Sequence, residues 1–309
     1  MRPDGFHDIE SLFASLALSD TLRFEPAGTK GESRLSVNRE FPDGETGKNE
    51  QIAARLEKDN LVLRAVSLFR ERTGFAQGLK IHLDKRIPLE AGLGGGSSDA
   101  ASTLLALNAL SARGLLGPET VLTLPELREM AASLGSDVPF FLDKENGGAA
   151  YVSGRGELVE KVHLPRGLWV VLVKPPFSSS TATAFALLDR AREQGTAGPF
   201  NRTISKEIII RSLEDNPEIW PFYNDFLPVF LNSNTTPNAM AQAAAYRSIL
   251  KTLKDFGASF AGLSGAGSCC FGIFKKKDEA ERAVQDFSGE GNFVKLTFFL
   301  AHKADSVLE

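Results

Sequence analysis

Pro88-Leu-Glu-Ala-Gly-Leu-Gly-Gly-Gly-Ser-Ser98 is the stretch of this sequence that decides the fold. It carries four glycines within five residues, and two serines follow them. Before it, residues 78–87 alternate between apolar and polar side chains, which predicts a half-buried strand. After it, residues 100–110 are apolar nearly all round a helical projection, which predicts a buried helix. The order predicted from the sequence is therefore strand, glycine loop and buried helix.

A loop of this kind is suited to bind phosphate. Glycines let the backbone approach a ligand closely, and the start of a helix adds unsatisfied N–H donors and a partial positive charge. The alternative is structural, with Ser97 or Ser98 as the N-cap of the helix and the glycines as a tight turn. No lysine follows the last glycine, so the loop is not a P-loop. The glycine spacing also differs from the dinucleotide-binding fingerprint.

Composition sets the class of protein. The chain has 309 residues, of which 42% are hydrophobic and 24% charged, enough for a large core and for two domains. A net charge of −4 gives no electrostatic case for nucleic acid. No apolar run approaches a membrane span, and the first residues are too polar for a signal peptide. Cys269 and Cys270 are adjacent and suit a reducing cytoplasm, and the four histidines have no metal-ligand spacing, so we expect a cytoplasmic protein with no metal-ligand cluster.

Two further stretches carry candidate chemistry. In Gly135-Ser-Asp-Val-Pro-Phe-Phe-Leu142, Asp137 stands between a helix end and an apolar run, where burial can raise the pKa of a general base. Asp137 could equally cap the short helix that follows. Residues 258–274 predict a strand, a glycine turn and a second strand, which could also be a simple hairpin. Strands and helices are mixed without regular alternation, which favours an α+β fold with two domains.

These stretches together resemble the GHMP kinases. The glycine stretch is similar to the family signature P-x-x-x-G-L-G-S-S-A-A, and its triple glycine resembles the branch that phosphorylates a cytidine-diphosphate-linked methylerythritol in the non-mevalonate isoprenoid pathway. Residues 135–140 resemble G-x-D-V-P-F, whose aspartate is the catalytic base, and residues 264–269 resemble a third motif near the triphosphate. Ala266 stands where that third motif has a serine.

The resemblance implies a fold, cofactors and site residues. We expect a two-domain GHMP kinase fold, with an ATP-binding domain over residues 1–162, a second domain over 163–309 and the active site in the cleft between them. We also expect ATP and Mg2+ as cofactors, and Asp137 as catalytic base for phosphorylation of the 2-hydroxyl of the substrate. The expected ATP-binding residues are Pro88, Leu89, Glu90, Ala91, Gly92, Leu93, Gly94, Gly95, Gly96, Ser97, Ser98, Gly265, Gly267 and Ser268.

The resemblance also implies a cytidine site. Residues 2–7, Arg-Pro-Asp-Gly-Phe-His, resemble the family's R-P-D-G-Y-H, in which the aromatic ring stacks on cytosine and the histidine binds the base. These roles fall on Phe6 and His7, and Thr181 and Phe185 match two further residues that line the site, although Phe185 could simply belong to the core. In the family a strand with a substrate-contacting lysine precedes this motif. We therefore expect a chain that starts at Met1 to be strongly impaired relative to one extended upstream.

Two other functions stay open at this point. One is a GHMP kinase for a different small molecule, of the homoserine or mevalonate type. The other is a nucleotide-binding protein with impaired turnover. We expect a small-molecule substrate and neither a nucleic-acid nor a membrane partner, and the sequence leaves monomer and homodimer equally open.

Overall fold

The structure is a computed structural model that describes residues 7–27, 31–39, 60–116, 120–142, 148–195, 204–233, 236–289 and 291–300. Phe6, one of the expected substrate residues, lies outside this described part. Within it, no helix is long and apolar enough to cross a membrane.

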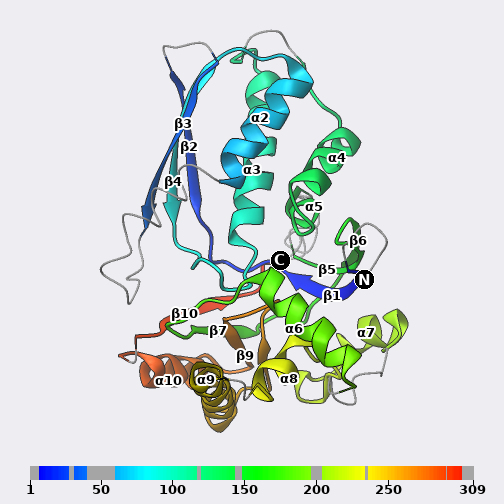
Figure 1. Cartoon of the computed structure of the whole chain (residues 1–309), viewed down its shortest axis with the longest axis vertical. Coiled ribbons are helices and arrows are strands. Elements are labelled where there is room, and N and C mark those ends of the chain that lie inside the picture. The colour runs from blue at the N-terminus through cyan, green and yellow to red at the C-terminus, as the bar shows by residue number, and fades with distance from the viewer. Residues whose placement is uncertain are drawn as a thin grey trace. The chain divides into compact units, whose positions relative to one another are not determined.

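The chain divides into two compact units (Figure 1). The first unit takes residues up to Ile87 and then Gly94–Val162, and the second takes Pro88–Leu93 and His163–Leu300. The glycine stretch is thus divided between them, because its first six residues belong to the second unit.

The first unit contains two three-stranded sheets. One has the order β2-β4-β3, in which β2 and β4 are antiparallel and β3 and β4 are parallel. The other has the order β1-β5-β6 and is antiparallel throughout. The strands are β1 (Ile9–Ala14), β2 (Thr21–Ala27), β3 (Ser33–Arg39), β4 (Gly78–Lys85), β5 (Ala149–Gly154) and β6 (Leu158–Val162).

The described residues of the first unit also form four helices. They are α2 (Leu61–Thr73), α3 (Gly95–Ser111), α4 (Leu124–Leu134) and α5 (Val138–Leu142). Local sequence sets their ends: the Asn60 side chain accepts a hydrogen bond from the N–H of Val62, and Thr123 forms a capping box with Glu126 at the start of α4. Helix α2 ends at Gly74, whose positive φ of 73° suits glycine.

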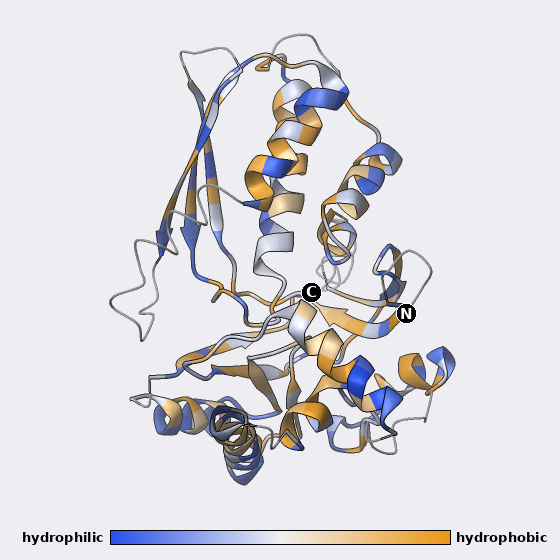
Figure 2. Ribbon diagram, viewed as in Figure 1, coloured by the Kyte–Doolittle hydropathy of each residue, from blue (hydrophilic) through white to orange (hydrophobic). Residues whose placement is uncertain are grey.

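The core of the first unit forms between the β2-β4-β3 sheet and α2–α5. The predicted buried helix is confirmed as α3, in which Ala100, Leu104 and Leu107 are fully buried. Figure 2 shows the glycine-rich start of α3 nearly white and its later turns orange. Apolar packing thus holds the later turns in place and leaves the polar first turn for other chemistry.

The second unit is built on an antiparallel four-stranded sheet in the order β10-β7-β9-β8. Helices α8, α9 and α10 contribute to its core, which includes Tyr246, Leu253 and Phe274. Its strands are β7 (Trp169–Lys174), β8 (Phe260–Leu263), β9 (Cys270–Phe274) and β10 (Phe293–Phe298). Its helices are α6 (Thr181–Glu193), α7 (Lys206–Ser212), the 3-10 turn η1 (Pro217–Ile219), α8 (Phe226–Leu231), α9 (Pro237–Asp255) and α10 (Lys277–Phe287).

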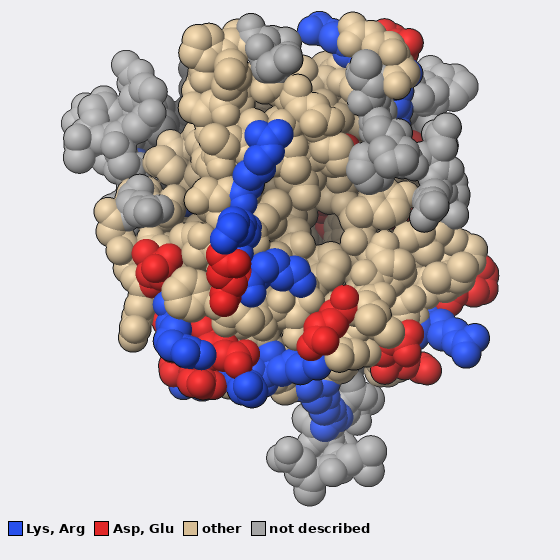
Figure 3. Space-filling view, turned by 90° about the horizontal axis from the view of Figure 1, so that it is seen from below, with Lys and Arg blue, Asp and Glu red and all other residues tan. Residues whose placement is uncertain are grey.

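The mixture of helices and antiparallel strands confirms the α+β class. The surface shows no large field of one sign on the face drawn in Figure 3, where Lys and Arg lie beside Asp and Glu.

Candidate functional site

The first turn of α3 is the centre of the candidate site. Gly94 is the N-cap of α3 with φ 66°, and it offers no side chain to the helix end. The alternative that Ser97 or Ser98 caps the helix is wrong, because both serines lie inside α3, and the Ser98 hydroxyl donates to the Gly95 carbonyl at 2.8 Å. The N–H groups of the first turn therefore have no acceptor from a capping side chain, which is the arrangement that binds anions.

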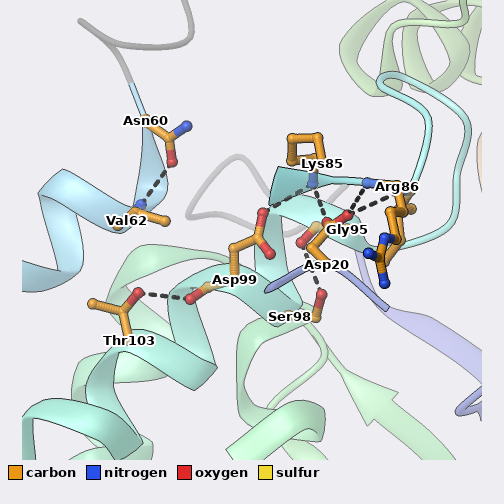
Figure 4. Close-up of polar contacts among 10 residues, drawn as sticks. Asp20, Asn60, Val62, Lys85, Arg86, Gly95, Ser98, Asp99 and Thr103 are labelled. Carbon is orange, nitrogen blue, oxygen red and sulfur yellow. Dashed lines mark hydrogen bonds and ion pairs between the residues drawn. The ribbon is translucent and has the colours of Figure 1, made fainter. Parts of the chain in front are cut away.

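Beside this turn lies a buried group of three charged side chains, Asp20, Lys85 and Asp99 (Figure 4). The Lys85 ammonium contacts the Asp20 carboxylate and donates to Asp99 Oδ2 at 2.9 Å. All three side chains are at most 5% exposed. The ammonium thus holds two carboxylates that burial would otherwise make very unfavourable.

Asp20 also fixes the point where the chain leaves β4. Its second carboxylate oxygen accepts from the backbone N–H groups of Arg86 and Ile87, at 2.6 and 2.8 Å. Burial is the main cause that raises the pKa of Asp99 to about 6, and the Lys85 ammonium opposes that rise. A β carbon placed on Gly95 would stand 2.9 Å from Ile87 and 3.2 Å from the Lys85 ammonium, so only glycine fits over this cluster without displacement.

Asp137 lies in the same unit, directly before α5. Helix α5 packs against α3, and its Phe141 ring lies 3.0 Å from where a β carbon of Gly94 would stand. Burial raises the pKa of the Asp137 carboxyl. Within the described residues this carboxylate accepts no hydrogen bond from α5, so the capping alternative finds no support there. A carboxylate in such a setting suits a general base.

A glycine supports the backbone next to Asp137. Gly156, in the turn between β5 and β6, has φ 126°, and a β carbon there would stand 2.2 Å from the Ser136 carbonyl oxygen. No side chain can occupy that space, so the β5–β6 turn packs directly on the segment that carries Asp137. The neighbouring Glu157 carboxylate accepts from the N–H of Arg155 at 2.6 Å and closes the same turn.

The first half of the glycine stretch packs on the second unit. The Ser264 hydroxyl donates to the Gly92 carbonyl at 2.8 Å, and the N–H of Cys269 donates to the Ala91 carbonyl at 3.1 Å. A β carbon on Gly92 would stand 2.1 Å from the Ser264 carbonyl oxygen. Two of the predicted glycine-rich segments, residues 88–93 and 264–269, therefore lie side by side in this unit.

The remaining predicted site residues lie in the β8–β9 turn, on α6 and before β1. Gly265, Gly267 and Ser268 lie in the turn between β8 and β9, and the Ser268 hydroxyl donates to the Phe177 carbonyl at 2.6 Å. Thr181 is the exposed first residue of α6, and Phe185 on the same helix is half-buried. The Phe185 ring lies edge-on to Phe226, with 4.9 Å between centroids. His7 precedes β1 and is half-buried.

Sequence reasoning missed several supporting residues. Asp20, Ser179, Asn224 and Ser264 all hold the glycine-rich segments, and each does so through partners distant in sequence. No local pattern marks Asp20, whose contact with Lys85 spans 65 residues. The described residues include no group of three or more His, Cys, Asp or Glu that could hold a metal ion.

Known proteins share this architecture. Residues 60–145 match the GHMP kinases N terminal domain, and residues 231–292 match GHMP kinases C terminal. A 4-diphosphocytidyl-2-C-methyl-D-erythritol kinase of Thermodesulfovibrio yellowstonii is 33% identical over 93% of this chain and 88% of its own length. That of Prosthecochloris aestuarii is 34% identical over 97% of this chain and 93% of its own length.

The chain belongs to the GHMP kinase family, in the branch of these relatives. A chloroplastic relative of Oryza sativa subsp. japonica is 36% identical, and this chain spans 60% of its length. A crystal structure of 4-(cytidine 5'-diphospho)-2C-methyl-D-erythritol kinase superposes with a TM-score of 0.66 at 30% identity, covering 96% of this chain and 92% of that chain. A homoserine kinase from Cytophaga hutchinsonii, with a TM-score of 0.60 at 18% identity and coverage of 94% and 95%, shares the fold alone.

GHMP kinases are small-molecule kinases that use ATP, and this assignment confirms the predicted family and enzyme class. It also explains why the glycines are placed where they are. A nucleoside triphosphate presents a chain of anionic oxygens, and the open first turn of α3 offers the donors that such a chain needs.

Proposed function

We propose that this GHMP kinase transfers the γ-phosphoryl group of ATP to the 2-hydroxyl of 4-diphosphocytidyl-2-C-methyl-D-erythritol. The proposal rests on the relatives of that name, which are 33–34% identical over nearly the whole chain. The observation that carries the chemistry is the Asp137 carboxyl, buried directly before a helix that packs on α3. The same unit thus supplies a base and an anion-binding helix start.

In the proposed reaction the substrate hydroxyl oxygen attacks the γ-phosphorus as the bond to the departing ADP breaks. Asp137 accepts the hydroxyl proton, which its raised pKa favours. We assign the stabilisation of the negative charge on the phosphates to the N–H groups at the start of α3 and, in the second unit, to those of Gly265 and Ala266. The divided glycine stretch of residues 88–98 is the proposed cradle of the nucleotide.

Mg2+ fits this site as a partner of the nucleotide. Magnesium takes oxygen ligands and usually keeps waters and substrate phosphates, with only one or two ligands from the protein. Because the Ser98 hydroxyl gives its proton to Gly95, its lone pairs stay available to a cation. We propose the Ser98 hydroxyl as a candidate ligand, and the ion would neutralise phosphate charge when bound.

The cytidine site and the domain boundaries stay predictions. We propose that Thr181 and the half-buried Phe185 line the cytidine site, and that His7 hydrogen-bonds the base. Phe6, the other proposed stacking residue, lies outside the described residues. We likewise propose domains over residues 1–162 and 163–309 and a cytoplasmic location. Both a monomer and a homodimer fit the proposal.

Substrate profiling tests the function. ADP release from ATP and Mg2+ is measured with 4-diphosphocytidyl-2-C-methyl-D-erythritol, homoserine and mevalonate, each over a range of concentrations. The proposal expects kcat/KM to be highest for the cytidine-linked alcohol by at least about a hundredfold, because homoserine and mevalonate leave the proposed base-binding residues unpaired. A higher kcat/KM for homoserine or mevalonate would contradict it.

A further inference from the structure

The turn between β8 and β9 is held by the side chain of Asn224, which lies just before α8. The Asn224 amide nitrogen donates to the Leu263 carbonyl at 3.0 Å and to the Gly265 carbonyl at 2.8 Å. Its amide oxygen accepts from the N–H of Phe226 at 2.9 Å. Both amide hydrogens are thus committed to the turn, while the oxygen fixes the side chain to the start of α8.

Ser179 provides a second tie from another direction. Its hydroxyl donates to the Ala266 carbonyl at 2.6 Å, and its backbone N–H donates to the Glu90 carbonyl at 3.3 Å. Glu90 belongs to the first half of the glycine stretch, and its carbonyl also accepts from the N–H of Ser268 at 3.4 Å. Ser179 therefore connects both glycine-rich segments of the second unit.

These ties determine where the N–H groups of the turn point. The peptide between Gly265 and Ala266 is trans, so its N–H points away from its carbonyl. When Asn224 binds the Gly265 carbonyl, the Ala266 N–H is directed to the opposite side. The Ser264 carbonyl accepts from the N–H of Gly267 at 2.8 Å. The Gly265 N–H belongs to the same peptide as that carbonyl, so it points away from Gly267.

Two successive N–H groups are left over by this arrangement. Among the described residues, no hydrogen bond uses the N–H of Gly265 or of Ala266. Gly265 is exposed and has φ 50°, a left-handed conformation in which consecutive N–H groups converge on an anion. Since Ala266 has no hydroxyl, its backbone N–H is the only donor that residue 266 can offer to a ligand.

We propose that Asn224 is a positioning residue of the nucleotide site and that Ser179 assists it. Asn224 holds the Leu263 and Gly265 carbonyls back, so that the N–H groups of residues 265 and 266 face the phosphates of the nucleotide. This inference rests on the proposed function only in that the turn binds nucleotide. It is independent of which alcohol receives the phosphoryl group.

The test compares two Asn→Asp substitutions. Asn224→Asp keeps an oxygen for the Phe226 N–H but removes both donors and places a carboxylate against two carbonyls. Asn216→Asp is the matched control, because the Asn216 side chain likewise accepts a backbone N–H, from Glu218 at 3.1 Å, at the start of η1. The affinity for ADP is measured by calorimetry, which needs no acceptor alcohol, and thermal unfolding is recorded for each variant.

We expect Asn224→Asp to weaken ADP binding by about tenfold or more, because it removes two hydrogen bonds and leaves both carbonyls of the turn unpaired. We expect Asn216→Asp to change the affinity for ADP by less than about twofold. In turnover assays the KM for ATP should rise in the same proportion while the KM for the alcohol stays within about twofold. Equal ADP affinities for the two folded variants would overturn the proposal.

Ser179 supplies a second, independent pair if Asn224→Asp does not fold. Ser179→Ala removes the hydroxyl bond to Ala266, and Ser179→Thr keeps a hydroxyl at the same place. We expect the alanine variant to bind ADP about three- to tenfold more weakly and the threonine variant to restore most of that loss. If Ser179→Ala binds ADP as tightly as the parent protein, the proposed positioning of the turn is wrong.

Discussion

Replacing Lys85 by methionine should destabilise the first unit strongly. The Lys85 side chain is 3% exposed and is shared by Asp20 and Asp99, themselves at most 5% exposed. Methionine keeps the unbranched stem and removes only the charge, so two buried carboxylates would lose their counter-ion. Removing one partner of a buried ion pair typically costs about 3–5 kcal/mol.

Part of that loss should be relieved by protonation of Asp99. Because its pKa is already about 6 in the presence of Lys85, loss of the ammonium raises it further and the carboxyl becomes neutral near pH 7. We therefore expect the lower end, about 3 kcal/mol, which corresponds to a fall in Tm of about 6–12 °C for a unit of this size. The double variant Lys85→Met/Asp99→Asn should recover part of the stability, because one of the two buried carboxylates without a counter-ion is removed.

The assay is urea unfolding at pH 7.5, with Lys80→Met as the control. Lys80 lies on the same strand, β4, but is exposed, so its substitution should change the free energy of unfolding by less than about 0.5 kcal/mol. If Lys85→Met were as stable as Lys80→Met, the buried cluster would contribute nothing, and our account of what supports the start of α3 would be refuted.

Three further outcomes are expected. Placing a non-glycine residue in a left-handed conformation costs about 1–2 kcal/mol, and Gly92→Ala should cost more than that because its β carbon would overlap the Ser264 carbonyl. Gly96→Ala should be nearly neutral in the same urea titration. Asp99 has a raised pKa, so its carboxyl keeps its proton to a higher pH in the folded state than in the unfolded state. The free energy of unfolding should therefore fall as pH rises from about 4 to 6. Asp99→Asn should flatten that fall in unfolding curves recorded across this range. The acid limb of the kcat–pH profile should have its midpoint above the usual aspartate value of about 3.9, because burial raises the pKa of Asp137, the group that must be ionised; a midpoint at or below 3.9 would count against that role.

The elements around the site were predictable because their signals are local. Alternation in residues 78–87 predicts β4, whose bounds are Gly78–Lys85, and the apolar run after the glycines predicts α3. Capping by Asn60 and Thr123 follows from side chains within three residues of the groups they bind. The glycine turn between two strands at residues 258–274 is confirmed as β8, turn and β9.

The supporting network was not predictable, because its partners are distant in sequence. Asn224 reaches Gly265 across 41 residues, and Asp20 reaches Arg86 across 66. The parallel pairing of β3 with β4 also joins segments that no turn connects. Periodicity indicates which face of an element is buried but not which polar group lies across the core from it. The sequence therefore left open the alternative that Ser97 or Ser98 caps α3, which the structure rules out because Gly94 is the N-cap.

The most direct test of the account is the phosphoryl-transfer rate of Asp137→Asn. The amide keeps the size and shape of the carboxyl but cannot accept the proton of the attacking hydroxyl. With 4-diphosphocytidyl-2-C-methyl-D-erythritol, ATP and Mg2+, the account predicts that kcat falls by about 10²–10⁴-fold relative to the parent chain, while ADP binds within about twofold of its parent affinity. A kcat within tenfold of the parent value, from a folded variant, would contradict the assignment of Asp137 as the base.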